Sequence, residues 1–311
     1  MPAVDEYTIG TLDEVTIMRF TKMHGLGNDY VFVDCFQEKV KAPSKLAPIV
    51  SDRHRGIGAD GLILICPSQK AGVRMRTFNA DGSEAEMCGN GVRCLAKYVY
   101  EHKLTEPGAA FLVPGRQPYP TSLDIETGKE IISVGLLTDE NNRVRKVCVN
   151  MGQPILAPEH IPVRLDTGKV VEHPIEVLGH ELHMTCASMG NPHAVFFCDD
   201  VALVDLEKLG PAIEHHSLFP NRTNVHFVQV EGRDELSMRT WERGSGITMA
   251  CGSGACAACV AGVLTRRQNR ACTAHLPGGD LDLYWAEKDN CVYMTGPAVQ
   301  VFQGTWPDTR T

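Results

Sequence analysis

Short runs of β-branched and aromatic residues recur along the chain, and many of them are bounded by Gly, Asn, Asp or Pro. Such runs predict β-strands. Few of them are separated by a long helical segment, so the pattern predicts a sheet that is largely antiparallel. The expected strands cover residues 18–25, 30–36, 61–67, 73–80, 129–137, 145–152, 193–200, 224–230, 235–244, 280–286 and 291–296.

Two stretches have the character of helices instead. Between about Gly91 and Lys103, apolar residues stand at positions 92, 95, 96, 99 and 100, which form one stripe of an α-helix. Between about Gly254 and Leu264 the residues are Ala, Cys, Val, Gly and Leu, without a polar face. A helix of that composition is expected to be buried on every side.

Both expected helices follow the same short motif. Cys-Gly-Asn-Gly begins at Cys88 and Cys-Gly-Ser-Gly begins at Cys251, about one domain length further along the chain. The repetition predicts a duplicated unit of the α/β (α+β) class, with one half at 1–149 and the other at 150–297. Residues 114–131 are rich in turn formers. Residues 1–17 are expected to be an extension, and 298–311 to return to the first half.

Composition narrows the class of protein. The chain has 311 residues, 43% hydrophobic and 22% charged, with a net charge of −8 and no basic block, which argues against nucleic-acid binding. The longest apolar run, 255–264, is too short to cross a bilayer. The first eighteen residues contain no Lys or Arg, unlike a signal peptide. We therefore expect a cytoplasmic protein whose twelve cysteines are reduced.

The two repeated cysteines suggest acid/base chemistry. A thiol at a helix start is expected to ionise more easily, because unpaired backbone N–H groups favour the thiolate. The glycines after each cysteine leave those N–H groups open to an anion such as a carboxylate. One thiolate could then remove a proton from one face of a carbon while the other thiol returns one to the opposite face, so no cofactor is expected.

Two other motifs are weaker. Cys256 and Cys259 have CxxC spacing, but they lie within the apolar helix without a second ligand pair, so we expect neither a metal site nor a redox disulfide. The run Gly56–Gly61 matches G-x-G-x-x-G, but a strand-like run follows it where a helix is needed. A dinucleotide site is therefore not expected.

The chain resembles the diaminopimelate epimerases, cofactor-independent amino-acid epimerases of lysine and cell-wall biosynthesis. The resemblance lies in "FTKMHGLGNDYVFVD" (20–34), "NADGSEAEMCGNGVRC" (79–94), "SMGNPHAV" (188–195), "RTNVHFV" (222–228) and "WERGSGITMACGSGACA" (241–257). It implies two similar domains, each with mainly antiparallel strands wrapped around a central helix, and a substrate in the cleft between them. It also implies a homodimer.

The resemblance assigns roles to particular residues. It implies that Cys88 and Cys251 are the acid/base pair, the first acting on L,L-diaminopimelate and the second on the meso form. His193 is implied near the cysteines, and Glu242 at the reacting end of the substrate. Backbone N–H groups of the helix starts would hold the reacting carboxylate: Gly89, Asn90, Gly252 and Ser253. The distal end of the substrate would be held by Asn28, Asn79, Asn191, Asn224 and Arg243.

Two residues depart from the family pattern, and related activities remain open. Gly61 stands where the family commonly has Gln, and Ile247 where it often has Glu. Proline racemases, hydroxyproline epimerases and phenazine-type isomerases share the implied fold, although Asn90 and the second cysteine motif favour the diaminopimelate branch. A binding protein that has lost catalysis, and a redox-sensing thiol protein, are the alternatives from other classes.

Overall fold

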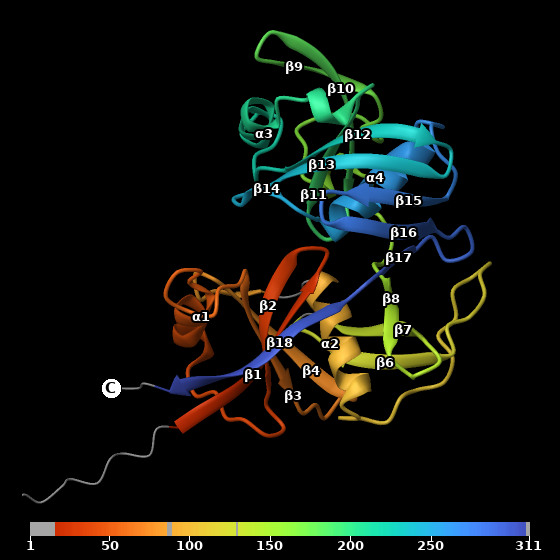
Figure 1. The fold of residues 1–311 in the computed structure, drawn as a ribbon. Helices are drawn as coiled ribbons and strands as arrows, with labels where there is room; N and C mark the ends of the chain where they lie inside the picture. Colours follow the sequence, from red (N-terminus) through yellow and green to blue (C-terminus); the bar gives the residue numbers. More distant parts are fainter. Residues whose placement is uncertain (1–15, 86–88, 129, 309–311) are drawn as a thin grey trace, which may run out of the picture.

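The computed structural model of the protein describes residues 16–85, 89–128 and 130–308, and Figure 1 shows them as two bodies, each containing a helix surrounded by strands. The first body contains α1 (Pro43–Ser51) and α2 (Gly89–Glu101). Its strands are β1 (Thr16–Gly25), β2 (Asn28–Asp34), β3 (Gly61–Cys66), β4 (Val73–Asn79), β5 (Glu84–Ala85), β6 (Thr121–Glu126), β7 (Ile131–Thr138) and β8 (Val144–Asn150).

The second body has the same kinds of elements, two helices and a set of strands. It contains the helices α3 (Leu206–Glu214) and α4 (Gly252–Leu264), with short 3-10 turns at Pro158–His160 and Val201–Leu203. Its strands are β9 (His173–Val177), β10 (His180–Ser188), β11 (Pro192–Phe197), β12 (Asn224–Gly232), β13 (Glu235–Glu242), β14 (Gly246–Thr248), β15 (Ala271–Leu276), β16 (Gly279–Trp285) and β17 (Val292–Gly296). The last strand, β18 (Val299–Asp308), returns to pair with β1.

The strand pairings of the two bodies match step for step. β1 pairs antiparallel with β2, β2 parallel with β3, β3 antiparallel with β4, and β4 parallel with β6. The pairings of β10 with β11, β11 with β12, β12 with β13 and β13 with β15 follow the same sequence of directions. The predicted duplication and the pseudo-symmetric, mixed α and β fold are therefore confirmed.

Each body has its own apolar core around its central helix. Val92, Leu95, Ala96 and Val99 of α2 are fully buried among the strands of the first body. Helix α4 is buried along nearly its whole length among the strands of the second, as its lack of a polar face predicts. Antiparallel pairing of β8 with β17 joins the bodies, and Leu26 in the turn between β1 and β2 packs into the core around α4.

The expected strands all have a counterpart, but parts of the fold differ from the sequence prediction. Both central helices begin two residues earlier than expected, at Gly89 and Gly252, because the motif glycines belong to the first helical turn. The parallel pairs, the strands β5, β6, β9, β10, β14 and β15 and the helices α1 and α3 were not expected, and for 298–311 a return to the first half was expected but not the strand β18. Among the described residues, no helix is long and apolar enough to span a membrane.

Candidate active site

The starts of α2 and α4 face one another where the two bodies meet. Met294 of β17 lies between them: a Cβ added to Gly89 would lie 3.5 Å from its Cε, and one added to Gly252 would lie 2.9 Å from its Sδ. The same Cβ on Gly252 would lie 3.7 Å from Oδ1 of Asn90. Two helix N-termini thus face a common space, and the first turn of a helix has N–H groups without a partner inside the helix. Cys88 itself lies outside the described residues.

Cys251 caps α4 and is almost entirely buried. Its thiol contacts the Glu242 carboxylate, and its sulfur is 3.7 Å from the Ser253 hydroxyl. Burial raises the pKa of the Cys251 thiol well above its ordinary value, and the negative charge of Glu242 raises it further. The expected lowering by the helix start is therefore outweighed, because loss of hydration penalises the thiolate more than one helical turn stabilises it. These effects favour the neutral thiol of Cys251.

Glu242 ends β13 beside this thiol. Its Oε1 accepts a hydrogen bond of 2.7 Å from the Thr248 hydroxyl, and its carboxylate also accepts a hydrogen bond from the Cys251 thiol. Burial raises the pKa of the Glu242 carboxyl, while the hydrogen bonds from Thr248 and Cys251 oppose that rise.

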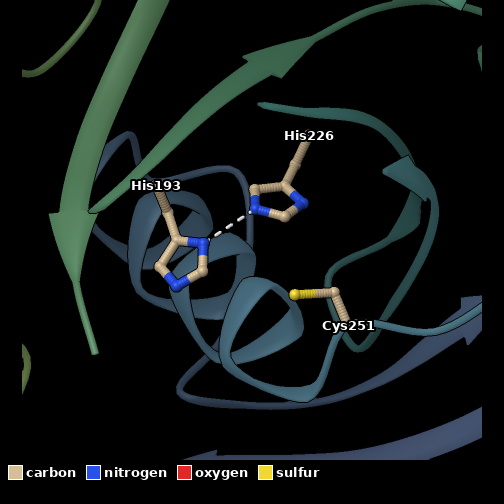
Figure 2. A group of neighbouring side chains, drawn as sticks. All are labelled: His193, His226 and Cys251. Atoms are coloured by element: carbon tan, nitrogen blue, oxygen red, sulfur yellow. Dashed lines mark hydrogen bonds between the residues drawn. The ribbon is translucent and has the colours of Figure 1, made fainter. Parts of the chain in front are cut away.

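A chain of buried polar side chains runs past the sulfur of Cys251. Nε2 of His193 is 2.9 Å from Oδ1 of Asn191, Nδ1 of His193 is 2.9 Å from Nε2 of His226, and Nδ1 of His226 is 2.9 Å from Oγ1 of Thr240. Figure 2 shows the two rings side by side with the sulfur of Cys251 facing them. The ligand atoms of the two histidines and the cysteine all lie within 4.8 Å of one another.

Both histidines are neutral in this environment. Burial lowers the pKa of His226 to about 3, and burial is also the main reason that the pKa of His193 falls well below its usual value. His193 was expected near the cysteines, and it does lie beside Cys251. His226 and Thr240 were not identified from the sequence, because a His or Thr within a buried strand has no signal apart from its place in the fold.

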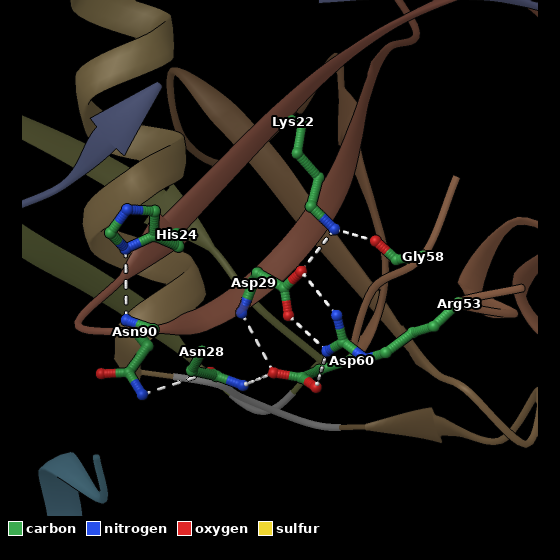
Figure 3. Close-up of polar contacts among 9 residues, drawn as sticks. Lys22, His24, Asn28, Asp29, Arg53, Gly58, Asp60 and Asn90 are labelled. Atoms are coloured by element: carbon green, nitrogen blue, oxygen red, sulfur yellow. Dashed lines mark hydrogen bonds and ion pairs between the residues drawn. The ribbon is translucent and has the colours of Figure 1, made fainter. Parts of the chain in front are cut away.

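A second polar network lies in the first body (Figure 3). Nδ2 of Asn90, in the first turn of α2, donates to Oδ1 of Asn28 over 3.2 Å, and Nδ2 of Asn28 donates to Asp60 over 2.7 Å. Arg53 binds Asp60 and Asp29, and Lys22 pairs with Asp29 over 2.5 Å. Asn28 and Asn90 are thereby held together at the start of α2. The aspartates of this network were not identified from the sequence.

The other predicted asparagines occupy different settings. Asn79 ends β4 at an exposed position and donates to the Ser83 hydroxyl over 3.0 Å. Asn191 precedes β11 and holds His193 as described above. Asn224 is buried at the start of β12, where its amide binds the Pro192 carbonyl and the backbone N–H of Arg243, so it ties three segments together.

Arg243 and Ser253 flank the same region. Arg243 is exposed, and its guanidinium donates to the Asn221 carbonyl over 3.1 Å. Ser253 is half-buried in the first turn of α4. The structure thus groups the described site residues around two centres. Asn28 and Asn90 lie at the start of α2, while Asn191, His193, Asn224, Glu242 and Arg243 lie with the start of α4.

The two departures from the family pattern differ in their surroundings. Gly61 opens β3 opposite Asn79, and an added Cβ would lie 2.2 Å from the Phe78 carbonyl oxygen. The backbone therefore leaves no room for a side chain at position 61, and the adjacent Asp60 supplies the polar group next to Asn28. Ile247 is exposed in β14.

Comparison with known proteins gives a consistent result. The sequence profile of the family described as "Diaminopimelate epimerase" matches residues 20–157 and 185–301. A diaminopimelate epimerase from Moorella thermoacetica is 54% identical over 291 residues, which is 93% of this chain and 99% of that protein. Diaminopimelate epimerases from Agathobacter rectalis and Acetivibrio thermocellus are each 51% identical, covering 92% of this chain and 98% of theirs.

Solved structures show the same fold at much lower identity. A phenazine biosynthesis protein of the PhzF family from Bacillus anthracis superposes with a TM-score of 0.65 at 15% identity, covering 94% of this chain and 99% of that one. A probable proline racemase from Agrobacterium radiobacter superposes with a TM-score of 0.62 at 13% identity, covering 93% of this chain and 92% of that one. At these identities the likeness concerns the fold alone.

Proposed function

The chain belongs to the diaminopimelate epimerase family, and from this we propose how its site performs the reaction of that family. The protein is an isomerase that interconverts L,L-diaminopimelate and meso-diaminopimelate in lysine biosynthesis. The observation that carries the mechanism is the approach of two Cys-Gly-x-Gly helix starts to one space beside Met294. In our proposal, the cysteine that precedes each helix start offers one carbon a sulfur, so that the carbon has a sulfur on each of two faces.

In our proposal Cys88 and Cys251 are the two acid/base groups, and no cofactor takes part. Cys251 waits as a thiol, since its burial disfavours the thiolate. Cys88 would then be the thiolate that removes the α-proton of L,L-diaminopimelate, and Cys251 would protonate the opposite face. The return reaction from the meso form uses the same groups in exchanged roles, with Cys251 as the base.

We propose that the two helix starts bind the reacting α-carboxylate through backbone N–H groups. The first-turn residues are Gly89 and Asn90 on α2, and Gly252 and Ser253 on α4. Their N–H groups would also stabilise the negative charge that builds up on the carboxylate when the α-proton leaves. Glu242, which accepts the hydrogen bond of the Cys251 thiol, would contact the reacting ammonium group.

The distal amino-acid end would be held by a set of amides and one guanidinium. Asn28 and Asn79 would contribute from the first body, and Asn191, Asn224 and Arg243 from the second. A side-chain amide offers both a donor and an acceptor, which suits a zwitterion, and Arg243 can bind a carboxylate with two N–H groups. His193 would support this set through Asn191.

We further propose a cytoplasmic homodimer. A mechanism with two free thiols needs a reducing compartment, and the described cysteines are all free. Among the described strands, β18 pairs only with β1, and it exposes Val299, Val301 and Phe302. A long edge strand with an apolar surface is usually covered by a partner.

We also propose that the two halves of the chain are residues 1–149 and 150–297. The ends of β8 and β17 support these boundaries.

The experiment that tests this function is α-proton exchange in D2O under reducing conditions. L,L-diaminopimelate, proline and hydroxyproline are incubated separately with the protein, and deuterium uptake is followed by NMR. We expect exchange and epimerisation of diaminopimelate only. Exchange of proline or hydroxyproline instead would assign the chain to a related racemase activity, and no exchange of any substrate would leave a binding protein.

A further inference from the structure

The histidine pair beside Cys251 has the composition of a metal site. His193, His226 and Cys251 offer two imidazole nitrogens and one sulfur within 4.8 Å of one another, and all three residues are buried. Two histidines with one cysteine, and a fourth position left open, form a ligand set that suits Zn²⁺. We propose that these three residues bind a thiophilic divalent cation, with Zn²⁺ the best match, and that its binding inhibits the epimerase by occupying the sulfur of Cys251.

Each of the two histidine rings has an oxygen atom next to its outer nitrogen, as histidine ligands of metal sites usually do. Histidine ligands usually donate their other ring N–H to an oxygen, which fixes the ring and its tautomer. The outer nitrogen of His193, Nε2, faces Oδ1 of Asn191, and the outer nitrogen of His226, Nδ1, faces Oγ1 of Thr240, each at 2.9 Å. Both outer nitrogens can therefore carry a proton, which frees Nδ1 of His193 and Nε2 of His226 for a cation.

The inner nitrogens need little movement to become ligands. They are 2.9 Å apart in a shared hydrogen bond. Tetrahedral zinc, with Zn–N near 2.0 Å and Zn–S near 2.3 Å, separates two nitrogens by about 3.3 Å and a nitrogen from a sulfur by about 3.5 Å. The rings would move apart by a few tenths of an ångström, and the sulfur, now within 4.8 Å of both, would swing toward them.

The protons balance in this step. On binding, the Cys251 thiol releases its proton to solvent and becomes a thiolate. The proton shared by the rings moves to Nδ1 of His226, where the Thr240 oxygen accepts it. The rings need lose no charge, since burial already keeps both neutral. The Glu242 carboxylate beside Cys251 favours a cation here, whereas the nearby positive charge of Arg243 opposes it.

The inference goes beyond the epimerase reaction, and its test does not depend on activity. Co²⁺ is titrated into the whole protein in a buffer with a non-thiol reductant, and the thiolate-to-cobalt absorption is recorded. We expect one Co²⁺ per chain, displaced by Zn²⁺ and removed by EDTA. Where epimerase activity is present, it should fall with Zn²⁺ occupancy and return with EDTA. Absence of the absorption would overturn the proposal.

Variants identify the ligands. His226→Gln and Cys251→Ser each remove a ligand and should weaken metal binding by at least about 100-fold. Loss of a group that only supports a ligand weakens binding by up to about that much. His275→Gln, at an exposed histidine, is the matched control and should bind as the wild type does. If Cys88→Ser abolished binding while His226→Gln did not, the metal would bridge the two thiols and the proposal would be wrong.

A direct measurement guards against a variant that fails to fold. X-ray absorption of the wild-type zinc complex should give one sulfur and two imidazole nitrogens around the metal, with one further light atom. Two sulfurs, or none, would contradict the assignment whatever the variants show.

Discussion

Cys251 shows how burial can set the role of a single residue. A helix start lowers the pKa of a thiol, but here the loss of hydration and the neighbouring Glu242 raise it instead. The neutral state of this thiol is thus set by the interior of the second body. The motif around Cys251 could be recognised from the sequence, whereas this direction of the pKa shift could not. The rise in the pKa depends on the packing of β13 against α4, and no local sequence pattern predicts that packing.

His226 gives a prediction about acid stability. Its pKa is about 3 in the folded protein and near 6.5 when unfolded, so below pH 6.5 the unfolded chain takes up a proton that the folded chain does not. The free energy of unfolding should therefore fall as the pH falls, by about 1.4 kcal/mol per pH unit from this residue.

The comparison of wild type with His226→Gln isolates this effect. Urea unfolding is measured at several values between pH 7 and pH 5. The variant should lose less stability on acidification, with a slope smaller by about one proton. Equal slopes in the two proteins would show that His226 is protonated in the folded state.

At the scale of elements, the start of α4 explains one motif glycine. A Cβ added to Gly254 would lie 2.2 Å from Cε1 of His226, a buried ring fixed by two hydrogen bonds. The second glycine of Cys-Gly-Ser-Gly is therefore needed for the packing of α4 against β12. The sequence indicated that the motif glycines open the backbone to a ligand, but it did not indicate this close contact.

Gly254→Ala should destabilise the protein although Ala favours helices. Alanine gains about 1 kcal/mol over glycine in helix propensity. After that gain is counted, overpacking against His226 is expected to lower the free energy of unfolding by about 1–3 kcal/mol. Thermal or urea unfolding measures the change. In the double variant with His226→Ala, the penalty should largely disappear.

Gly262→Ala in the same helix is the control. There the added Cβ meets Oε1 of Gln268 at 2.5 Å, the far end of an unbranched side chain that is held by one hydrogen bond, from its Nε2 to the Glu235 carbonyl. Its cost should be clearly smaller than that of Gly254→Ala. Equal costs at both positions would argue against the contact with His226 as the cause.

At the scale of the molecule, the duplication was the most predictable feature. The repeated Cys-Gly-x-Gly motif and the strand-rich pattern indicated two similar halves, and the matched pairings bear this out. The parallel pairs were not predicted, because β2 with β3 and β11 with β12 are neighbours only after α1 and α3 cross over between them. Pairings between distant segments have no local signal in the sequence.

The exposed edge of β18 gives a prediction about assembly. Val301 is 54% exposed among the apolar residues of this strand. Val301→Asp should weaken the proposed dimer by at least about tenfold, because a charge would be desolvated in the interface. Sedimentation over a range of concentrations measures the change. Leu203→Asp, at a side chain 83% exposed on another surface, should leave the dimer intact. A wild-type monomer, or an unchanged dimer in Val301→Asp, would contradict this assignment.

The central claim is that one sulfur removes the α-proton and a second sulfur returns one to the opposite face. The most direct measurement is early-time epimerisation of L,L-diaminopimelate in D2O, with deuterium counted separately in product and recovered substrate. The account predicts deuterium in the newly formed meso product while the unreacted substrate retains its proton, and no exchange in the Cys88→Ala and Cys251→Ala double variant. Product that retains the original proton, or undiminished exchange in the double variant, would contradict it.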